Sequence, residues 1–217
     1  MFQGYLLSNN IKKIGIFLFL FICFSCNKKA QLEKEIAATP IEITVERFDQ
    51  AFMQTAKENL GSLKQQYPFL FPKKTPDSVF LERTQDPIQK MIQKSVDSVF
   101  SDFQDTELEL KALYKHLKYY NPSLKTPRII TVYSDVDYRN KVIVTDSIVI
   151  ISIDNYLGAQ HEFYDSFYKY IKNNLKKDQI VMDLADAYAS RLINQPKRNT
   201  FLEELIYHGK KLYLKDL

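Results

Sequence analysis

The chain has 217 residues, a formal net charge of +4 and no tryptophan. Two of its lysines lie in an N-terminal segment with the features of a removable signal, and without them the net charge is +4 − 2 = +2. A charge this small gives no electrostatic support to nucleic-acid binding, and the lack of a glycine-rich phosphate loop excludes the usual nucleotide-binding enzymes.

The N-terminus reads as a bacterial lipoprotein signal. Lys12 and Lys13 precede roughly ten apolar residues, too few to span a hydrocarbon core of about 30 Å, and small Ser25 then precedes Cys26. We predict a signal peptide over residues 1–25 and lipid attachment at Cys26, because an uncleaved membrane helix needs about 20 apolar residues. Several acyl chains on one residue give stable membrane anchoring.

The mature chain then has no thiol available for chemistry. Cys23 leaves with the signal and Cys26 carries the lipid. This excludes a disulfide, a zinc–thiolate site and a cysteine nucleophile, and we expect no cofactor. Residues 26–40 are polar and lack periodicity, so we predict a lipidated N-terminus and flexible tether there, followed by a single domain over residues 41–217.

Helical signals dominate the first half of that domain. A short alternating segment at residues 41–45 predicts a strand, and helical spacing then continues from Phe48 to Gln66. Proline after an oxygen-bearing residue predicts helix starts at Thr75-Pro76-Asp77 and at Asp86-Pro87. A further helix is expected over about residues 106–120.

Strands follow, and helices then return. Runs rich in β-branched residues predict strands at 129–133, 142–144 and 148–153, the last two forming a hairpin. Helical periodicity is expected at about 162–175, at 180–192 and from Thr200 to the end. The order helices, then a small antiparallel or mixed sheet, then helices predicts an α+β fold. The last helix has no stop signal, which predicts a domain incomplete at its C-terminus.

One histidine lies in a sequence that resembles part of a metal motif. His161 and Asp165 are one helical turn apart with Glu162 beside them, as in His-Glu-x-x-His with its second histidine replaced. The alternative is a solvated helix start whose acidic residues complement the helix dipole. Neither His116 nor His208 lies at a recognisable ligand spacing.

Two further groups of polar residues are candidates for a functional site. Asp183, Asp186 and Ser190 share one helix face and suit either acid–base chemistry or simple solvation. The turn Asp154-Asn155-Tyr156-Leu157-Gly158 follows the most apolar strand, where side chains can reach a ligand, and Gly158 suits the backbone geometry of that turn.

Four motifs follow the lipoprotein signal in order: Glu46-Arg47-Phe48-Asp49, Tyr67-Pro68-Phe69-Leu70-Phe71-Pro72, Asp154-Asn155-Tyr156-Leu157-Gly158 and Tyr207-His208-Gly209-Lys210-Lys211-Leu212-Tyr213-Leu214-Lys215-Asp216. In content and order the chain resembles the gliding-motility lipoprotein GldB family of Bacteroidetes. Members of that family usually continue beyond the last motif, in agreement with an incomplete C-terminus.

The resemblance implies a role in gliding motility and type IX secretion at the cell envelope, and membership of the family does not by itself imply an enzymatic activity. The family's domain is similar to zincin-like metalloproteases, whose metal helix would fall at residues 184–190. Asp186 and Ser190 stand where that motif has its two histidines, and Ala187 stands where it has its glutamate. The comparison therefore implies a pseudo-metalloprotease without its metal.

We therefore expect a non-catalytic, lipid-anchored envelope protein that supports gliding motility or type IX secretion through contacts with other envelope proteins. The alternative is a lipid-anchored, metal-dependent hydrolase that uses His161, Glu162 and Asp165. Asn27-Lys28-Lys29 lacks the acidic residues typical of surface-export signals in this group. We accordingly expect the protein in the cell membrane or outer membrane, facing the periplasm.

Overall fold

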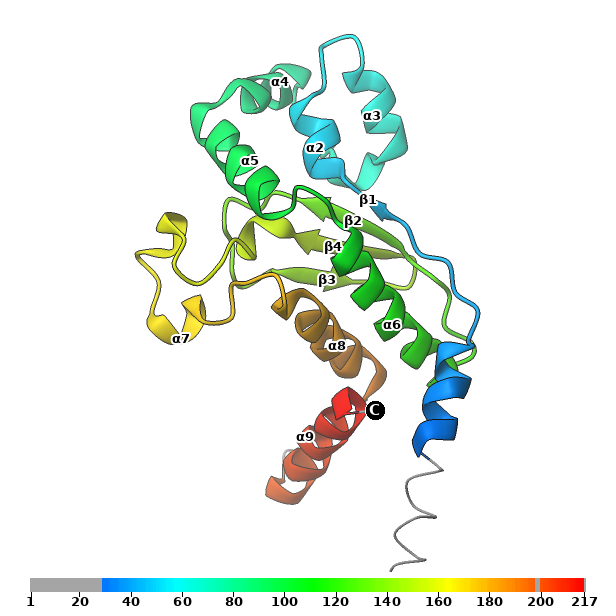
Figure 1. Ribbon diagram of the computed structural model, residues 1–217. Coiled ribbons are helices and arrows are strands. Elements are labelled where there is room, and N and C mark those ends of the chain that lie inside the picture. The colour runs from blue at the N-terminus through cyan, green and yellow to red at the C-terminus, as the bar shows by residue number, and fades with distance from the viewer. Residues whose placement is uncertain (1–28, 198–199, 217) are drawn as a thin grey trace, which may run out of the picture.

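The computed structural model describes residues 29–197 and 200–216, and the predicted signal peptide and Cys26 lie outside these ranges. The fold is α+β with a small mixed sheet, as the sequence predicts (Figure 1). The strands are β1 (Val45–Glu46), β2 (Arg128–Val132), β3 (Val142–Val144) and β4 (Ile148–Ser152), in the spatial order β1-β2-β4-β3. β1, β2 and β4 run parallel, and β3 forms the predicted antiparallel hairpin with β4.

Helices precede and follow the three central strands. The first group is α2 (Phe48–Met53), α3 (Leu60–Gln66), α4 (Asp77–Gln85), α5 (Pro87–Val99) and α6 (Gln104–Tyr120), with a 3₁₀ turn, η1, at Pro68–Leu70. The second group is α7 (Lys169–Lys172), α8 (Gln179–Leu192) and α9 (Phe201–Asp216), preceded by the 3₁₀ turns η2 (Ile153–Asn155) and η3 (Glu162–Tyr164). α5 begins at the predicted proline, and the Asp86 carboxylate caps it by accepting from the backbone N–H of Ile88 at 2.7 Å.

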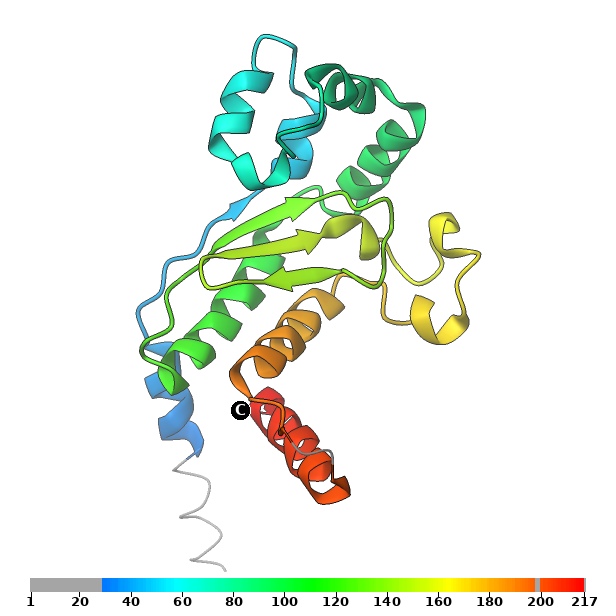
Figure 2. The same ribbon diagram turned by 180° about the vertical axis from the view of Figure 1, so that it is seen from behind.

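Each face of the sheet has its own apolar core, because successive strand side chains point to opposite faces. Ile129 and Ile151 pack with residues of α5, α6 and α8 in the larger core. Ile130 packs on the opposite face with the aromatic side chains of the α2–α3 region. Seen from behind in Figure 2, the sheet lies in front of α6 and α8, which therefore cover a single face.

The start of the described chain differs from the predicted flexible tether. Residues 29–37 form a helix whose Ile36 is only 2 % exposed. The Tyr119 hydroxyl on α6 donates to Glu35 at 2.9 Å, and Lys115 donates to the carbonyl of Ala37. The prediction of a flexible tether is therefore wrong for residues 29–37, because contacts with α6 hold this helix on the domain.

Two predicted helices are interrupted. The one expected from Phe48 to Gln66 is two helices, and the Thr55 hydroxyl closes the first by donating to the carbonyl of Ala51 at 2.7 Å. The one expected at 162–175 consists of η3 and the short α7. Tertiary contacts override helical periodicity there, since the buried Tyr164 hydroxyl bonds to the backbone of Asp154 and Leu157.

The last helix presents an apolar surface to solvent. α9 contains no buried residue, and its exposed apolar side chains include Leu202, Leu205, Ile206, Leu212 and Tyr213. Among residues 29–197 and 200–216, no helix combines the length and apolar character needed to cross a membrane.

Candidate functional site

The three parallel strands end at one edge of the sheet, where ligands bind in many open sheets with parallel strands. β1 leads there into Arg47 and α2, β2 leads into the loop at 133–141, and β4 leads into η2. At this edge the Gln50 amide of α2 donates to Asp97 of α5, and Asp135 of the loop pairs with Arg83 of α4. We call the resulting region the carboxyl-edge site.

Asp154 joins the loop after β2 to the end of β4. Its side chain is fully buried and accepts hydrogen bonds from the backbone N–H of Val136 at 2.7 Å and of Ser134 at 3.1 Å. The Ser134 hydroxyl adds a bond at 3.2 Å and itself accepts from the Asn155 amide at 3.0 Å. Burial raises the pKa of Asp154, and the donated hydrogen bonds oppose that rise. The prediction that this turn reaches a ligand is therefore corrected for Asp154, which points inward.

The same loop contains two non-glycine residues in the left-handed region. Asp135 has φ 57° and Val136 has φ 61°. A β-branched residue rarely adopts this conformation, which costs of order 1–3 kcal/mol and persists only where the surroundings hold it. Here the bond from the Val136 N–H to Asp154 holds it. Strained residues of this kind cluster at binding and catalytic sites, so the loop is a candidate for such a site.

Asp135 connects the strained loop to the two helices above it. Its carboxylate pairs with the Arg83 guanidinium of α4 at 2.9 Å and accepts from the side-chain amide of Gln89 on α5. Because the Gln89 nitrogen makes this bond, its amide oxygen points elsewhere. That buried oxygen has no hydrogen-bond partner within the described part of the chain. The residue therefore retains unused accepting capacity beside the site.

A second carboxylate is buried nearby. Asp49 is 1 % exposed and forms a two-pronged ion pair with Arg47, with N–O distances of 3.0 and 2.8 Å. The Thr131 hydroxyl also donates to it. Burial, followed by the charge of Asp49, raises the pKa of the Tyr133 phenol above its ordinary value of 10. These interactions tie α2 to β2 and leave Asp49 fully engaged in the fold.

A cavity of about 700 Å³ opens beside Asp135. Its apolar walls come from α5, the strained loop and the η3 region, and its charged residues come from α4, from Asp86 before α5 and from the loop. The lining residues are Glu82, Arg83, Asp86, Ile88, Gln89, Ile92, Asp135, Val136, Phe163 and Phe167. Apolar walls with a few polar groups suit binding, and arginine and aromatic side chains are enriched at protein interfaces.

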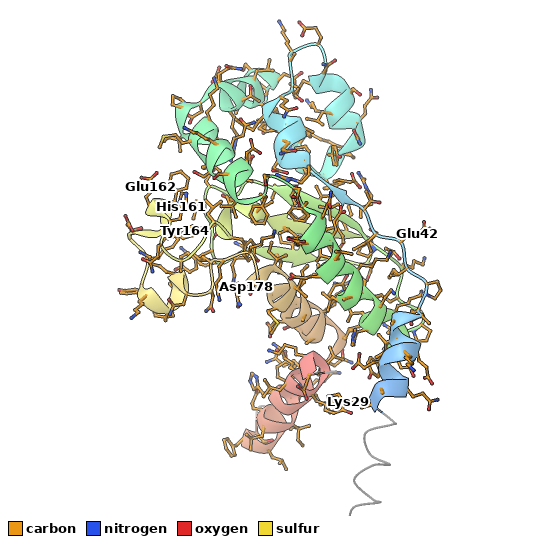
Figure 3. The ribbon with its side chains drawn as sticks, viewed as in Figure 1. Lys29, Glu42, His161, Glu162, Tyr164 and Asp178 are labelled. Atoms are coloured by element: carbon orange, nitrogen blue, oxygen red, sulfur yellow. The ribbon has the colours of Figure 1, made fainter. Side chains whose placement is uncertain are left out.

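In the part of the chain that the structure describes, His161, Glu162 and Asp165 do not come together as a group of candidate metal ligands. His161 caps η3 and Glu162 begins it, and both lie at one side of the molecule, apart from Asp178 before α8 (Figure 3). The His161 ring nitrogen Nδ1 accepts from the N–H of Phe163 at 3.3 Å, and Asp165 pairs with Lys172. Within 29–197 and 200–216, no three His, Cys, Asp or Glu side chains group closely enough to hold a metal ion.

The polar face of α8 is engaged in ion pairs. Asp183 accepts from the Tyr156 hydroxyl at 2.8 Å and pairs with Lys141 at 2.5 Å. Asp186 pairs with Lys215 of α9 at 2.8 Å, and the hydrogen bond from this lysine is the main cause of its lowered pKa. Ser190 is exposed. Of the residues at the zincin ligand positions, Asp186 therefore holds α8 against α9 through its ion pair. Together with Ala187 and Ser190 it does not make up a set of metal ligands.

Sequence reasoning missed the residues that build the carboxyl-edge site. No sequence motif marks Arg83, Gln89 or Ser134-Asp135 as functional residues. The position of Ser134-Asp135 just after a strand could have identified the loop as a site. The spacing along the chain, however, does not reveal that Arg83 meets Asp135.

A family model described as gliding motility protein GldB matches residues 29–217. The chain matches no curated protein and no solved structure. The match includes every segment of the carboxyl-edge site and all of α8 and α9. This chain belongs to the GldB family of gliding motility lipoproteins.

Proposed function

We propose that the protein is a non-catalytic, lipid-anchored envelope component that supports gliding motility or type IX secretion by binding another envelope protein. In this proposal residues 1–25 are removed, Cys26 carries the lipid, and the domain faces the periplasm. The observation that carries the proposal is the family match over residues 29–217.

The pairing of charged groups favours contact over catalysis. Asp49, Asp135 and Asp183 each pair with a basic residue, and Asp154 is enclosed by hydrogen bonds from the loop. General acid–base chemistry needs a titratable group within hydrogen-bond reach of a substrate. Groups that already hold the fold together are poorly placed for that role.

The cavity beside Asp135 is the surface that we assign to the partner. Ile88 at its rim is 63 % exposed, and Phe163 and Phe167 form apolar wall. Arg83 supplies a charged group next to them. An apolar side chain of a partner, seated beside a charged contact, would bury these walls and supply the core of an interface.

The test is co-purification from envelope membranes with Ile88→Asp. An aspartate in the first turn of α5 suits the helix dipole, so the domain should remain folded while the cavity rim becomes charged. Leu108→Asp on α6 is the matched control, since Leu108 is 67 % exposed and lies outside the cavity. We expect Ile88→Asp to lose the partner and Leu108→Asp to retain it. Equal recovery with both variants would contradict the assignment of this surface.

A further inference from the structure

The helix α9 carries an exposed apolar stripe that the fold does not use. The stripe consists of six large apolar side chains, each between 48 % and 81 % exposed. They are Phe201, Leu202, Leu205, Ile206, Leu212 and Tyr213. At 3.6 residues per turn these positions fall on one side of the helix. A contiguous apolar surface of this kind marks a contact with another apolar phase or molecule.

The opposite side of α9 fixes the direction of the stripe. Lys211 and Lys215 both pair with Asp186 on α8, at 3.8 and 2.8 Å. Leu214 lies between them on the same side and lines a cavity of about 580 Å³ shared with α6 and α8. Since these contacts hold one side of α9 against α8, the apolar stripe is directed away from the domain.

The stripe lies at the end of the molecule where the chain enters. The helix at 29–37 and α9 occupy the same end, below α6 and α8 in both Figure 1 and Figure 2. Lys29 is three residues from Cys26, and three residues span at most about 11 Å. A lipid on Cys26 would therefore bring this end of the domain close to the bilayer surface.

From this arrangement we propose that the apolar stripe of α9 docks on the lipid bilayer and forms a second membrane contact beside the lipid anchor. This inference rests on the proposed lipid attachment at Cys26. An amphipathic helix in the interface buries its apolar face about 5–10 Å into the headgroup and acyl boundary. α9 then lies in the membrane surface and fixes the orientation of the domain, which a lipid on a single residue leaves free.

The test places an environment-sensitive fluorophore on Leu205→Cys in the mature, lipidated protein, reconstituted into vesicles of phosphatidylethanolamine and phosphatidylglycerol. With Cys23 removed and Cys26 acylated, the new cysteine is the sole free thiol. Val79→Cys on α4 is the matched control, because Val79 and Leu205 are 47 % and 54 % exposed. Their helices, α4 and α9, lie at opposite ends of the molecule (Figure 1). Leu212→Cys provides a second position on the stripe.

We expect the emission at Leu205→Cys and Leu212→Cys to shift to shorter wavelength and to be quenched by lipids bearing a nitroxide. Val79→Cys should show neither effect. A shift without lipid quenching would mean that protein covers the stripe, and no shift would mean that it stays in water. If mass spectrometry shows that Cys26 is acylated, either of these two results overturns the bilayer contact but leaves the lipid anchor in place. A sample without lipid on Cys26 overturns the anchor and this inference together.

Discussion

Asp154 shows how one buried carboxylate organises the carboxyl-edge site. Its two oxygens accept from the N–H groups of Ser134 and Val136, and these bonds keep the loop in its left-handed conformation. The loop in turn presents Asp135 to Arg83 and Gln89. A local change at Asp154 should therefore affect both stability and the shape of the cavity.

We predict that Asp154→Asn lowers the free energy of unfolding by about 1–3 kcal/mol, the usual cost of leaving a buried donor without its acceptor. The amide puts an NH₂ group where one carboxylate oxygen now accepts. Urea unfolding measures the change. Asp165→Asn is the control, since this exposed carboxylate pairs only on the surface with Lys172 and its loss should cost less than about 0.5 kcal/mol. Equal losses for both variants would contradict the role given to Asp154.

Helix α9 depends on an ion pair as well as on apolar contact. Asp186 is partly exposed, and its hydrogen bond with Lys215 is the main cause of its lowered pKa. A carboxyl group with a lowered pKa in the folded state stabilises the fold above its ordinary pKa of 3.8, and that contribution disappears as the pH falls through the lowered value.

We predict that Asp186→Asn loosens α9 from α8 at neutral pH, and that strong acid loosens α9 in the otherwise unchanged protein. Energy transfer between labels at Leu108→Cys on α6 and Leu212→Cys on α9 reports this movement. Transfer should fall on acidification with Asp186 present and should be low and insensitive to pH with Asp186→Asn. If energy transfer showed the same pH dependence with Asp186 and with Asp186→Asn, other contacts would hold α9 on α8. Asp165→Asn is the control, and it should leave the transfer and its pH dependence unchanged.

Periodicity predicted some elements well and others poorly, for physical reasons. α6 and α8 match their apolar spacing because one side of each is buried in the larger core. The helix expected at 162–175 is broken because the Tyr164 hydroxyl bonds to the backbone of Asp154 and Leu157. A contact of this kind depends on segments brought together by the fold, and no local pattern contains it.

At the scale of the whole molecule, our proposal assigns the location of the domain to a lipid anchor on Cys26. We predict that Cys26→Ala abolishes fatty-acid labelling and processing of the chain. Cys23→Ala is the control: in our proposal this residue leaves with the signal peptide, so its replacement should be silent. Labelling that persists in Cys26→Ala would contradict the anchor, as would a mature protein that begins at Met1.

The α+β class and the family followed from the sequence because strand and helix patterns and the order of four motifs are properties of the chain itself. The carboxyl-edge site did not, because Arg83, Gln89 and Asp135 come from separate segments. The parallel pairing of β1, β2 and β4 brings these segments together. The spatial order of strands cannot be read from the local composition of a sequence.

Gliding rescue in cells that lack the native protein tests the central claim, that this domain acts by contact and without catalysis. We predict that His161→Ala and Glu162→Ala restore gliding as well as the unmodified protein does, as should Leu108→Asp. Ile88→Asp should fail although it is lipidated and present at a normal level. Failure of His161→Ala and Glu162→Ala with full rescue by Ile88→Asp would contradict the account and favour a hydrolase.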